Sequence, residues 1–166
     1  MKRPIKDLML LSCLIVMLPL TSEPSYSQSL TSITESDIHA MINAMDKAAR
    51  KGNVAGMIAP IASDAKIKLT VVGPKTDKEV TVTFTKEQFA HTARVTMRRK
   101  ISYNFERKNI RIEIYDDTTA MVTSELYETL KLPEGTLRSS SSEELYISLR
   151  DGKLVITSSE TRGRFY

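Results

Sequence analysis

The chain has 166 residues, of which 41% are hydrophobic and 27% charged, and its formal net charge is +4. This positive charge is too small to indicate a nucleic-acid partner. The sequence contains neither a serine nucleophile elbow nor a glycine-rich phosphate loop, so it supports neither triad hydrolysis nor nucleotide binding.

Residues 1–27 have the features of a secretory signal peptide. Three basic residues lie within the first six positions, an apolar run follows at 8–20, and Ser-Tyr-Ser at 25–27 is a small-residue cleavage site. The apolar run is shorter than the roughly 20 residues that span a bilayer. We therefore expect cleavage after Ser27 and export to the periplasm or the medium. An uncleaved membrane anchor and a lipoprotein modified at Cys13 are the alternatives.

Cleavage would leave 139 residues with a net charge of +3. This length suits one domain with its own hydrophobic core. We expect residues 28–34 to form a flexible N-terminus and residues 35–166 to form a single domain without stable membrane insertion. Because Cys13 is the only cysteine and is removed, the mature protein has no disulfide, no cysteine-ligated zinc and no thiol nucleophile.

The first part of the domain has a helical pattern. From Ser36, apolar residues recur at spacings of three and four, which predicts an amphipathic helix that Thr34 or Ser36 caps and Gly52 ends. The apolar positions are Ile38, Met41, Ile42, Met45 and Ala49. The opposite face carries His39, Asn43, Asp46, Lys47 and Arg50. Asn53 is expected to cap a short second helix that Pro60 ends or bends.

A hairpin and a third helix follow. Residues 66–71 and 80–84 alternate apolar and polar side chains on either side of a polar turn, which is typical of two paired strands. Thr85 with Gln88 forms a capping-box pattern, so a helix is expected over 86–100. Its inward residues are Phe89, Ala93 and Met97.

The remainder is expected to be strand. In residues 101–114 the apolar positions change from odd to even, which requires a β-bulge near Arg107 to Asn109. The next strands are joined by a turn at "PEGT" (133–136) and by Asp151-Gly152, a strong hairpin signal. The last strand runs from Lys153 to about Arg162.

This order of elements predicts an α+β fold in which a curved antiparallel sheet wraps around about three helices to form a cone. Together with the passage "AARKGNVAGMIAPIASDAKIKLTV" (48–71), it resembles the nuclear transport factor 2-like superfamily, which includes SnoaL-like and ketosteroid-isomerase-like proteins. The resemblance covers roughly residues 35–162. It implies a cystatin-like roll and a homodimer.

The isomerase branch of this superfamily uses a tyrosine on the first helix and an aspartate on the first strand. This sequence has no tyrosine on its first helix, and Leu69 falls about where that aspartate would lie. The resemblance therefore supports the fold without supporting isomerase chemistry.

The two turns, at "PEGT" and at Asp151-Gly152, predict how the last three strands pair. A two-residue loop at Asp151-Gly152 pairs Leu149 with Leu154 and continues to Glu143 with Glu160. A four-residue loop at "PEGT" pairs Leu132 with Leu137 and therefore Glu128 with Ser141. The inner face of the sheet then changes from apolar to polar along the strands, as a cone with a closed base and an open mouth requires.

The polar end of this face supplies a candidate ligand pocket. Its residues are Ser124, Glu128, Ser141, Glu143, Ser158, Glu160 and Arg162, and Tyr103 and Phe105 are candidate walls. Because directly opposed carboxylates repel, we expect Glu143 and Glu160 to titrate as a coupled pair with Arg162 nearby. The alternative is that these side chains overhang the helices and are solvated.

The histidines do not indicate a metal. His39 and His91 lie on separate helices without neighbours at ligand spacing, so no metal or cofactor is expected. The basic residues His91, Arg94, Arg98, Arg99 and Lys100 suit a solvated helix face, or alternatively an anionic ligand or partner.

Three functions are compatible with these observations. The first is binding of a small, largely apolar molecule, and the second is an enzyme in which Glu128 or Glu143 is the general base toward an apolar carbonyl compound. The third is an envelope scaffold. A homodimer could form through the outer sheet face, which carries Tyr127, Tyr146, Ser148, Val155 and Thr157.

Overall fold

The computed structural model describes residues 29–73 and 78–166. The expected signal peptide, with Cys13, lies outside the described residues. The helices are α1 (Glu35–Lys51), α2 (Val54–Ile58) and α3 (Lys86–Arg99). The strands are β1 (Ile61–Val72), β2 (Glu79–Phe84), β3 (Ser102–Ile114), β4 (Thr119–Leu132), β5 (Gly135–Arg150) and β6 (Lys153–Phe165).

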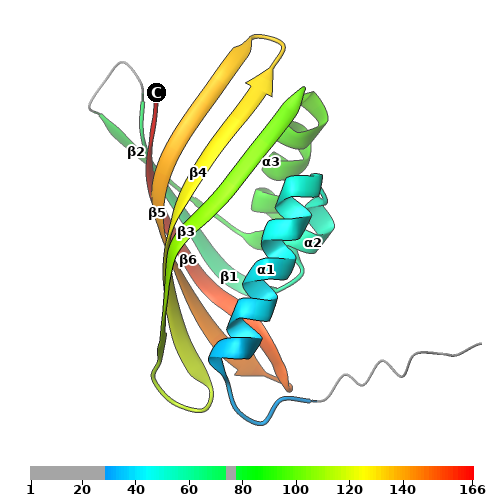
Figure 1. Ribbon diagram of the computed structural model, residues 1–166, viewed down its shortest axis with the longest axis vertical. Helices are drawn as coiled ribbons and strands as arrows, with labels where there is room; N and C mark the ends of the chain where they lie inside the picture. Colours follow the sequence, from blue (N-terminus) through cyan, green and yellow to red (C-terminus); the bar gives the residue numbers. More distant parts are fainter. Residues whose placement is uncertain (1–28, 74–77) are drawn as a thin grey trace, which may run out of the picture.

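All three helices cover one face of a single curved sheet (Figure 1). The strand order is β2-β1-β6-β5-β4-β3. The α+β class is confirmed, but the sheet is mixed, because β1 and β6 pair in parallel. Helix α3 connects β2, at one edge of the sheet, to β3, at the other edge. Strands β3 to β6 are antiparallel to one another and fill the sheet back to β1, beside which β6 lies parallel.

The helix ends follow the capping residues of the sequence. Thr34 caps α1 and accepts a hydrogen bond from the backbone of Asp37, and Asn53 caps α2. Thr85 and Gln88 form the predicted capping box of α3. Each of these side chains satisfies an N–H group that the first helical turn leaves unpaired.

Two predicted backbone features are confirmed. The register of β3 against β4 shifts between Lys108 and Arg111, and Asn109 has a φ of 53°. Arg150 pairs with Lys153, so Asp151 and Gly152, with φ of 50° and 70°, form a two-residue turn.

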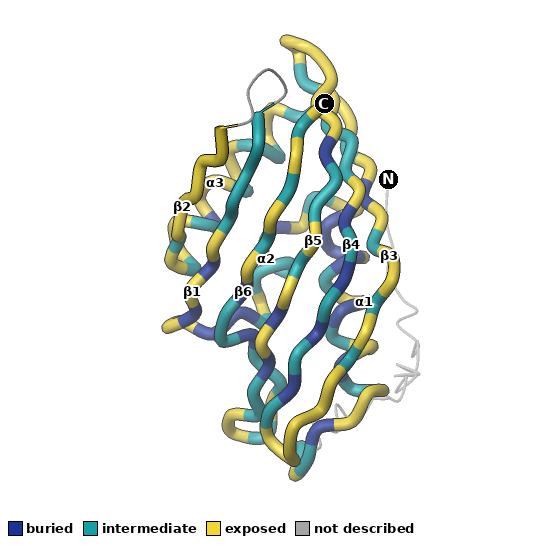
Figure 2. The backbone as a smooth tube through the Cα atoms, turned by 90° about the vertical axis from the view of Figure 1, so that its left-hand side faces the viewer, coloured by how far each residue is buried: buried dark blue, intermediate teal, exposed yellow. Residues whose placement is uncertain are grey.

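The core lies between α1 and the inner face of the sheet. Its most completely buried large side chains are Ile38, Ile42, Val122, Ile147 and Ile156. Figure 2 shows buried positions recurring along the central strands, alternating with more exposed ones. Within the part of the chain that the structure describes, no helix is both long and apolar enough to span a membrane.

The segment before α1 differs from the expectation of a flexible N-terminus. The backbone N–H of Leu30 donates to Gly152 (3.0 Å) and that of Ile33 donates to Asp117 (2.8 Å). Ile33 is buried and belongs to the main hydrophobic cluster. Burial of an isoleucine side chain holds this segment on the sheet, which the helical and strand patterns of the sequence did not reveal.

Candidate functional site

A cavity of about 240 Å³ lies between the helices and the inner face of the sheet. Met45 and Ala49 of α1, Met57 of α2 and Phe89 of α3 line the helical side. Most of the sheet side is also apolar, and it includes Leu69, Leu126 and Leu145. The charged residues that line it are Asp46, Arg107, Glu128 and Glu143. The cavity is therefore an apolar space with a polar region.

Arg107 of β3 organises the first part of this polar region. Its Nε lies 3.1 Å from Oδ1 of Asp46, and its Nη1 lies 2.6 Å from Oγ of Ser124 and also contacts Oε2 of Glu143. The side chains of Arg107 and Asp46 are only 5% and 8% exposed. One guanidinium in the cavity wall thus joins α1, β4 and β5.

The electrostatics of this cluster favour the charged guanidinium. Burial alone would lower the pKa of Arg107, but the nearby carboxylates of Glu143 and Asp46 outweigh burial and raise that pKa. Arg107 therefore remains a cation, and it compensates the buried carboxylate of Asp46 and the largely buried carboxylate of Glu143 at once.

Tyr103 and Glu128 form the second part. The hydroxyl of Tyr103 donates to Oε1 of Glu128 at 2.5 Å, and Oγ of Ser139 donates to Oε2 at 3.2 Å. Burial, followed by the charge of Glu128, strongly raises the pKa of the Tyr103 phenol. Tyr103 therefore stays protonated at neutral pH and donates to Glu128.

An aromatic wall connects the two parts. The rings of Tyr103 and Phe105 stack with centroids 6.3 Å apart, and the guanidinium of Arg107 lies 5.7 Å from the Phe105 centroid. These three residues alternate along β3, so their side chains share the inner face. Tyr103 and Phe105 both line the cavity.

The "PEGT" turn differs from the prediction by two residues of register. Leu132 pairs with Gly135, so only Pro133 and Glu134 form the loop. Gly135 has a φ of 149°, a conformation that favours glycine, and this allows the second strand to begin there. Glu128 consequently pairs with Ser139, and Ser124 pairs with Glu143.

The predicted pair of Glu143 with Glu160 is wrong. The turn and its first pairs are as expected, but a β-bulge shifts the register between Tyr146 and Ile147. Beyond it, Glu143 lies opposite Thr161, and Glu160 lies opposite Glu144. One extra residue in β6 reverses which side chains face inward, so the two carboxylates lie on opposite faces of the sheet.

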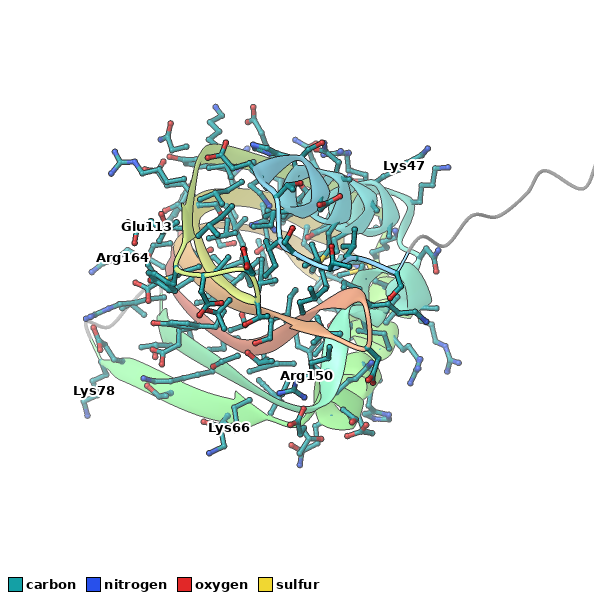
Figure 3. The ribbon with its side chains drawn as sticks, turned by 90° about the horizontal axis from the view of Figure 1, so that it is seen from below. Lys47, Lys66, Lys78, Glu113, Arg150 and Arg164 are labelled. Carbon is teal, nitrogen blue, oxygen red and sulfur yellow. The ribbon has the colours of Figure 1, made fainter. Side chains whose placement is uncertain are left out.

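The bulge also places other candidate residues on the outer face. Oγ of Ser158 donates to the Lys66 carbonyl at 3.3 Å, Glu160 pairs with Lys68 at 3.1 Å, and Arg162 pairs with Glu79. These residues do not line the cavity. Figure 3, which views the molecule from below, shows the labelled Lys66 at its periphery.

The remaining candidates face inward. Glu128 and Glu143 line the cavity, and Ser124 accepts a hydrogen bond from Arg107, which lines it. Ser141 shares the inner face, opposite Leu126, but does not line the cavity. The structure thus brings together Tyr103, Phe105, Ser124, Glu128 and Glu143, and separates them from Ser158, Glu160 and Arg162.

Asp46 and Arg107 were missed, although the sequence contained a signal for each. Asp46 follows the buried Ile42 by four residues, so it lies on the apolar face of α1 rather than on the polar face to which it was assigned. Arg107 continues the odd-numbered inner positions of Tyr103 and Phe105. A charged residue at a core-facing position on each of two elements predicts a buried ion pair.

Among the described residues, no group of three or more side chains is arranged to hold a metal ion. His39 and His91 are exposed, on α1 and α3.

Comparisons with known proteins support the fold. No family model and no curated protein sequence matches this chain. Among solved structures, it is similar to a scytalone dehydratase-like protein from Novosphingobium aromaticivorans (TM-score 0.62, 14% identity, 77% of this chain and 82% of that one). It is also similar to a nuclear transport factor 2-like protein of unknown function from Pseudomonas putida (TM-score 0.56, 14% identity, 77% and 84%).

A third similar structure is a cystatin-like-fold protein from Caulobacter vibrioides (TM-score 0.62, 14% identity, 76% and 87%). At these identities the similarity establishes the fold alone. The protein has the nuclear transport factor 2-like fold, as the resemblance in its sequence predicted.

Proposed function

We propose that this protein binds a small, largely apolar molecule in the cavity between its helices and its sheet. The observation that carries this proposal is the composition of the cavity, in which an apolar lining meets two hydrogen-bonded polar clusters. Such a combination is typical of ligand sites, where apolar surface supplies affinity and a few polar groups fix orientation.

The size of the cavity limits the ligand. Its volume of about 240 Å³ is below the range of about 300–1,000 Å³ that is usual for drug-sized molecules. An engineered apolar cavity of about 150 Å³ accommodates benzene. A single ring with a short polar arm is therefore an appropriate size.

Native mass spectrometry of the full chain, expressed with its leader and recovered from a bacterial periplasm, tests this proposal. We expect an added mass that is lost when the same sample is denatured. Ala49→Leu, which fills the cavity from α1, should abolish the added mass. Ala44→Leu is the matched control, because it adds the same atoms to an exposed position on the same helix. A wild-type protein without added mass, or an Ala49→Leu protein that retains it, would contradict the proposal.

The same spectrum addresses two further proposals. We propose that the protein is exported, in which case its mass should lack residues 1–27. We also propose that it is a homodimer through the outer sheet face, where Tyr127 and Tyr146 are 38% and 39% exposed. The native mass should then be twice that of the chain.

A second candidate function is general-base catalysis by Glu128. Glu143 is paired with Arg107, whereas both carboxylate oxygens of Glu128 accept hydrogen bonds from neutral hydroxyls. Glu128 is therefore the better placed carboxylate to take a proton from a bound molecule. The similarity to a scytalone dehydratase-like structure supports this candidate. Turnover of the identified ligand that Glu128→Gln abolishes would favour it over simple binding.

A further inference from the structure

We infer that the cavity selects a small apolar amine in its protonated form, so that the ammonium group lies beside Glu128 and Tyr103. This inference rests on the proposed binding function and identifies the chemical class of the ligand. Three independent features of the polar region lead to it: its formal charge, its hydrogen-bonding groups and its aromatic wall.

The first feature is charge. Among the described residues that line the cavity, three carry carboxylates (Asp46, Glu128 and Glu143) and one carries a guanidinium (Arg107). Arg107 contacts both Asp46 and Glu143. The contacts of Glu128 are instead with the hydroxyls of Tyr103 and Ser139. A carboxylate in a largely apolar space is strongly stabilised by a cation and destabilised by a second anion.

The second feature is the balance of hydrogen-bond donors and acceptors. Nε and Nη1 of Arg107 are directed at the protein's own acceptors, on Asp46, Ser124 and Glu143. Tyr103 uses its proton for Glu128, which leaves its oxygen as an acceptor. The region around Glu128 therefore offers mainly acceptors, and it suits a ligand group that donates. An ammonium group has three donors and no acceptor.

The third feature is the aromatic wall. Tyr103 and Phe105 present stacked rings at the polar end of the cavity. Arg107 already lies 5.7 Å from the Phe105 centroid, which shows that this wall accommodates a cation. A ligand ammonium near Tyr103 would gain a similar interaction, whereas a carboxylate or phosphate would face the negative side of the rings.

The strongly raised pKa of Tyr103 agrees with these features. Because burial and Glu128 keep the phenol protonated, Tyr103 remains a donor to Glu128 over the whole neutral range. The hydroxyl of Tyr103 therefore keeps the same protonation state throughout this range.

Three probes of nearly equal size test the inference: benzylamine, benzyl alcohol and benzoate, which are cationic, neutral and anionic at pH 7. Each is titrated into the protein recovered from the periplasm, and dissociation constants are measured by protein-detected NMR. A hydrogen bond to a charged group is strong enough that benzylamine should bind at least about tenfold more tightly than benzyl alcohol. Benzoate should bind most weakly.

Glu128→Gln should reduce benzylamine binding to that of benzyl alcohol, because it removes the charge and keeps the shape. The matched control is Glu125→Gln, which removes a carboxylate from the outer face of the same strand and should leave the preference unchanged. If Glu128→Gln does not fold, as judged by circular dichroism, the order of the three probes on the wild-type protein still decides.

Several outcomes would overturn the inference. Benzyl alcohol or benzoate binding as tightly as benzylamine, or more tightly, would overturn the preference for an amine but leave the cavity a binding site. A molecule without an amine as the added mass in the native spectrum would have the same meaning. Failure of all three probes together with a cavity occupied by a molecule that is not an amine would also reject the amine and preserve the proposed function. Failure of all three with an empty cavity would reject both.

Discussion

Arg107 is the residue on which the cluster of Asp46, Ser124 and Glu143 depends, because it compensates the buried carboxylate of Asp46 and the largely buried carboxylate of Glu143. Asp46 belongs to α1 and Glu143 to β5, and both lie within ion-pair distance of the guanidinium. Buried ion pairs add little net stability when they are complete, but removal of one partner leaves an uncompensated charge. In this protein a single truncation would leave two.

Arg107→Met should therefore destabilise the protein by about 3–5 kcal/mol, measured as the free energy of unfolding in urea at pH 7. Arg150→Met is the control: the Arg150 side chain is 46% exposed and pairs with exposed Asp64, so its loss should cost about 0–1 kcal/mol. Adding Asp46→Asn and Glu143→Gln to Arg107→Met should recover part of the stability. Equal effects of the two arginine variants would show that the carboxylates are not buried with Arg107.

At the scale of elements, the contact between β5 and β6 depends on a glycine. A Cβ atom on Gly163 would lie 2.6 Å from Cβ of Ser141 and 2.9 Å from the Ser140 carbonyl oxygen. One of these neighbours is backbone, so the strands would have to separate. Glycine is therefore required where the two backbones approach this closely.

Gly163→Ala should destabilise the protein by about 1–3 kcal/mol, the usual cost of overpacking, and should lower the urea midpoint accordingly. Ser141→Gly in the same chain removes the nearer obstacle and should restore part of the loss. If Gly163→Ala unfolds at the wild-type midpoint, the strands have room to adjust and the close approach is not a constraint.

The two strand irregularities explain which parts of the sheet could be predicted. The β3 bulge was visible because apolar residues on both sides of it, such as Phe105 and Ile110, changed parity. In β6, Ile156 is followed by Thr157, Ser158 and Ser159, whose hydroxyls fit either face. The extra residue therefore left no mark on the hydrophobic pattern.

The sequence placed a candidate residue on the correct face of the sheet wherever the predicted alternation of its strand agrees with the structure. Tyr103, Phe105 and Glu128 were identified from parity within single strands, which does not depend on pairing. The position of Glu160 depended on pairing across the bulge, and so it was assigned to the wrong face. The strand and helix patterns could have placed Asp46 and Arg107 on inward faces, but they do not specify the packing that brings residues 46, 107 and 143 together.

At the scale of the whole molecule, the chain preceding α1 closes the end of the fold opposite the β4–β5 turn (Figure 1). The backbone N–H of Leu30 donates a hydrogen bond to the carbonyl of Gly152 in the β5–β6 turn, and that of Ile33 donates to the carbonyl of Asp117 between β3 and β4. Ile33 is 6% exposed and joins the core cluster of Ile38 and Ile147. This segment therefore connects two turns that are distant in sequence.

A chain that begins at residue 35 should consequently be less stable than one that begins at residue 28, by about 2–5 kcal/mol in urea unfolding. It loses the burial of an isoleucine, two backbone hydrogen bonds and the Thr34 cap of α1. Ile33→Ala in the longer chain should account for much of the difference, whereas Thr31→Ala, at an exposed position, should have little effect. Equal midpoints for the two chains would mean that the segment rests on the sheet without stabilising it. A difference would mean that the proposed cleavage after Ser27 would retain a structural part of the domain, and that cleavage after Ile33 would remove it.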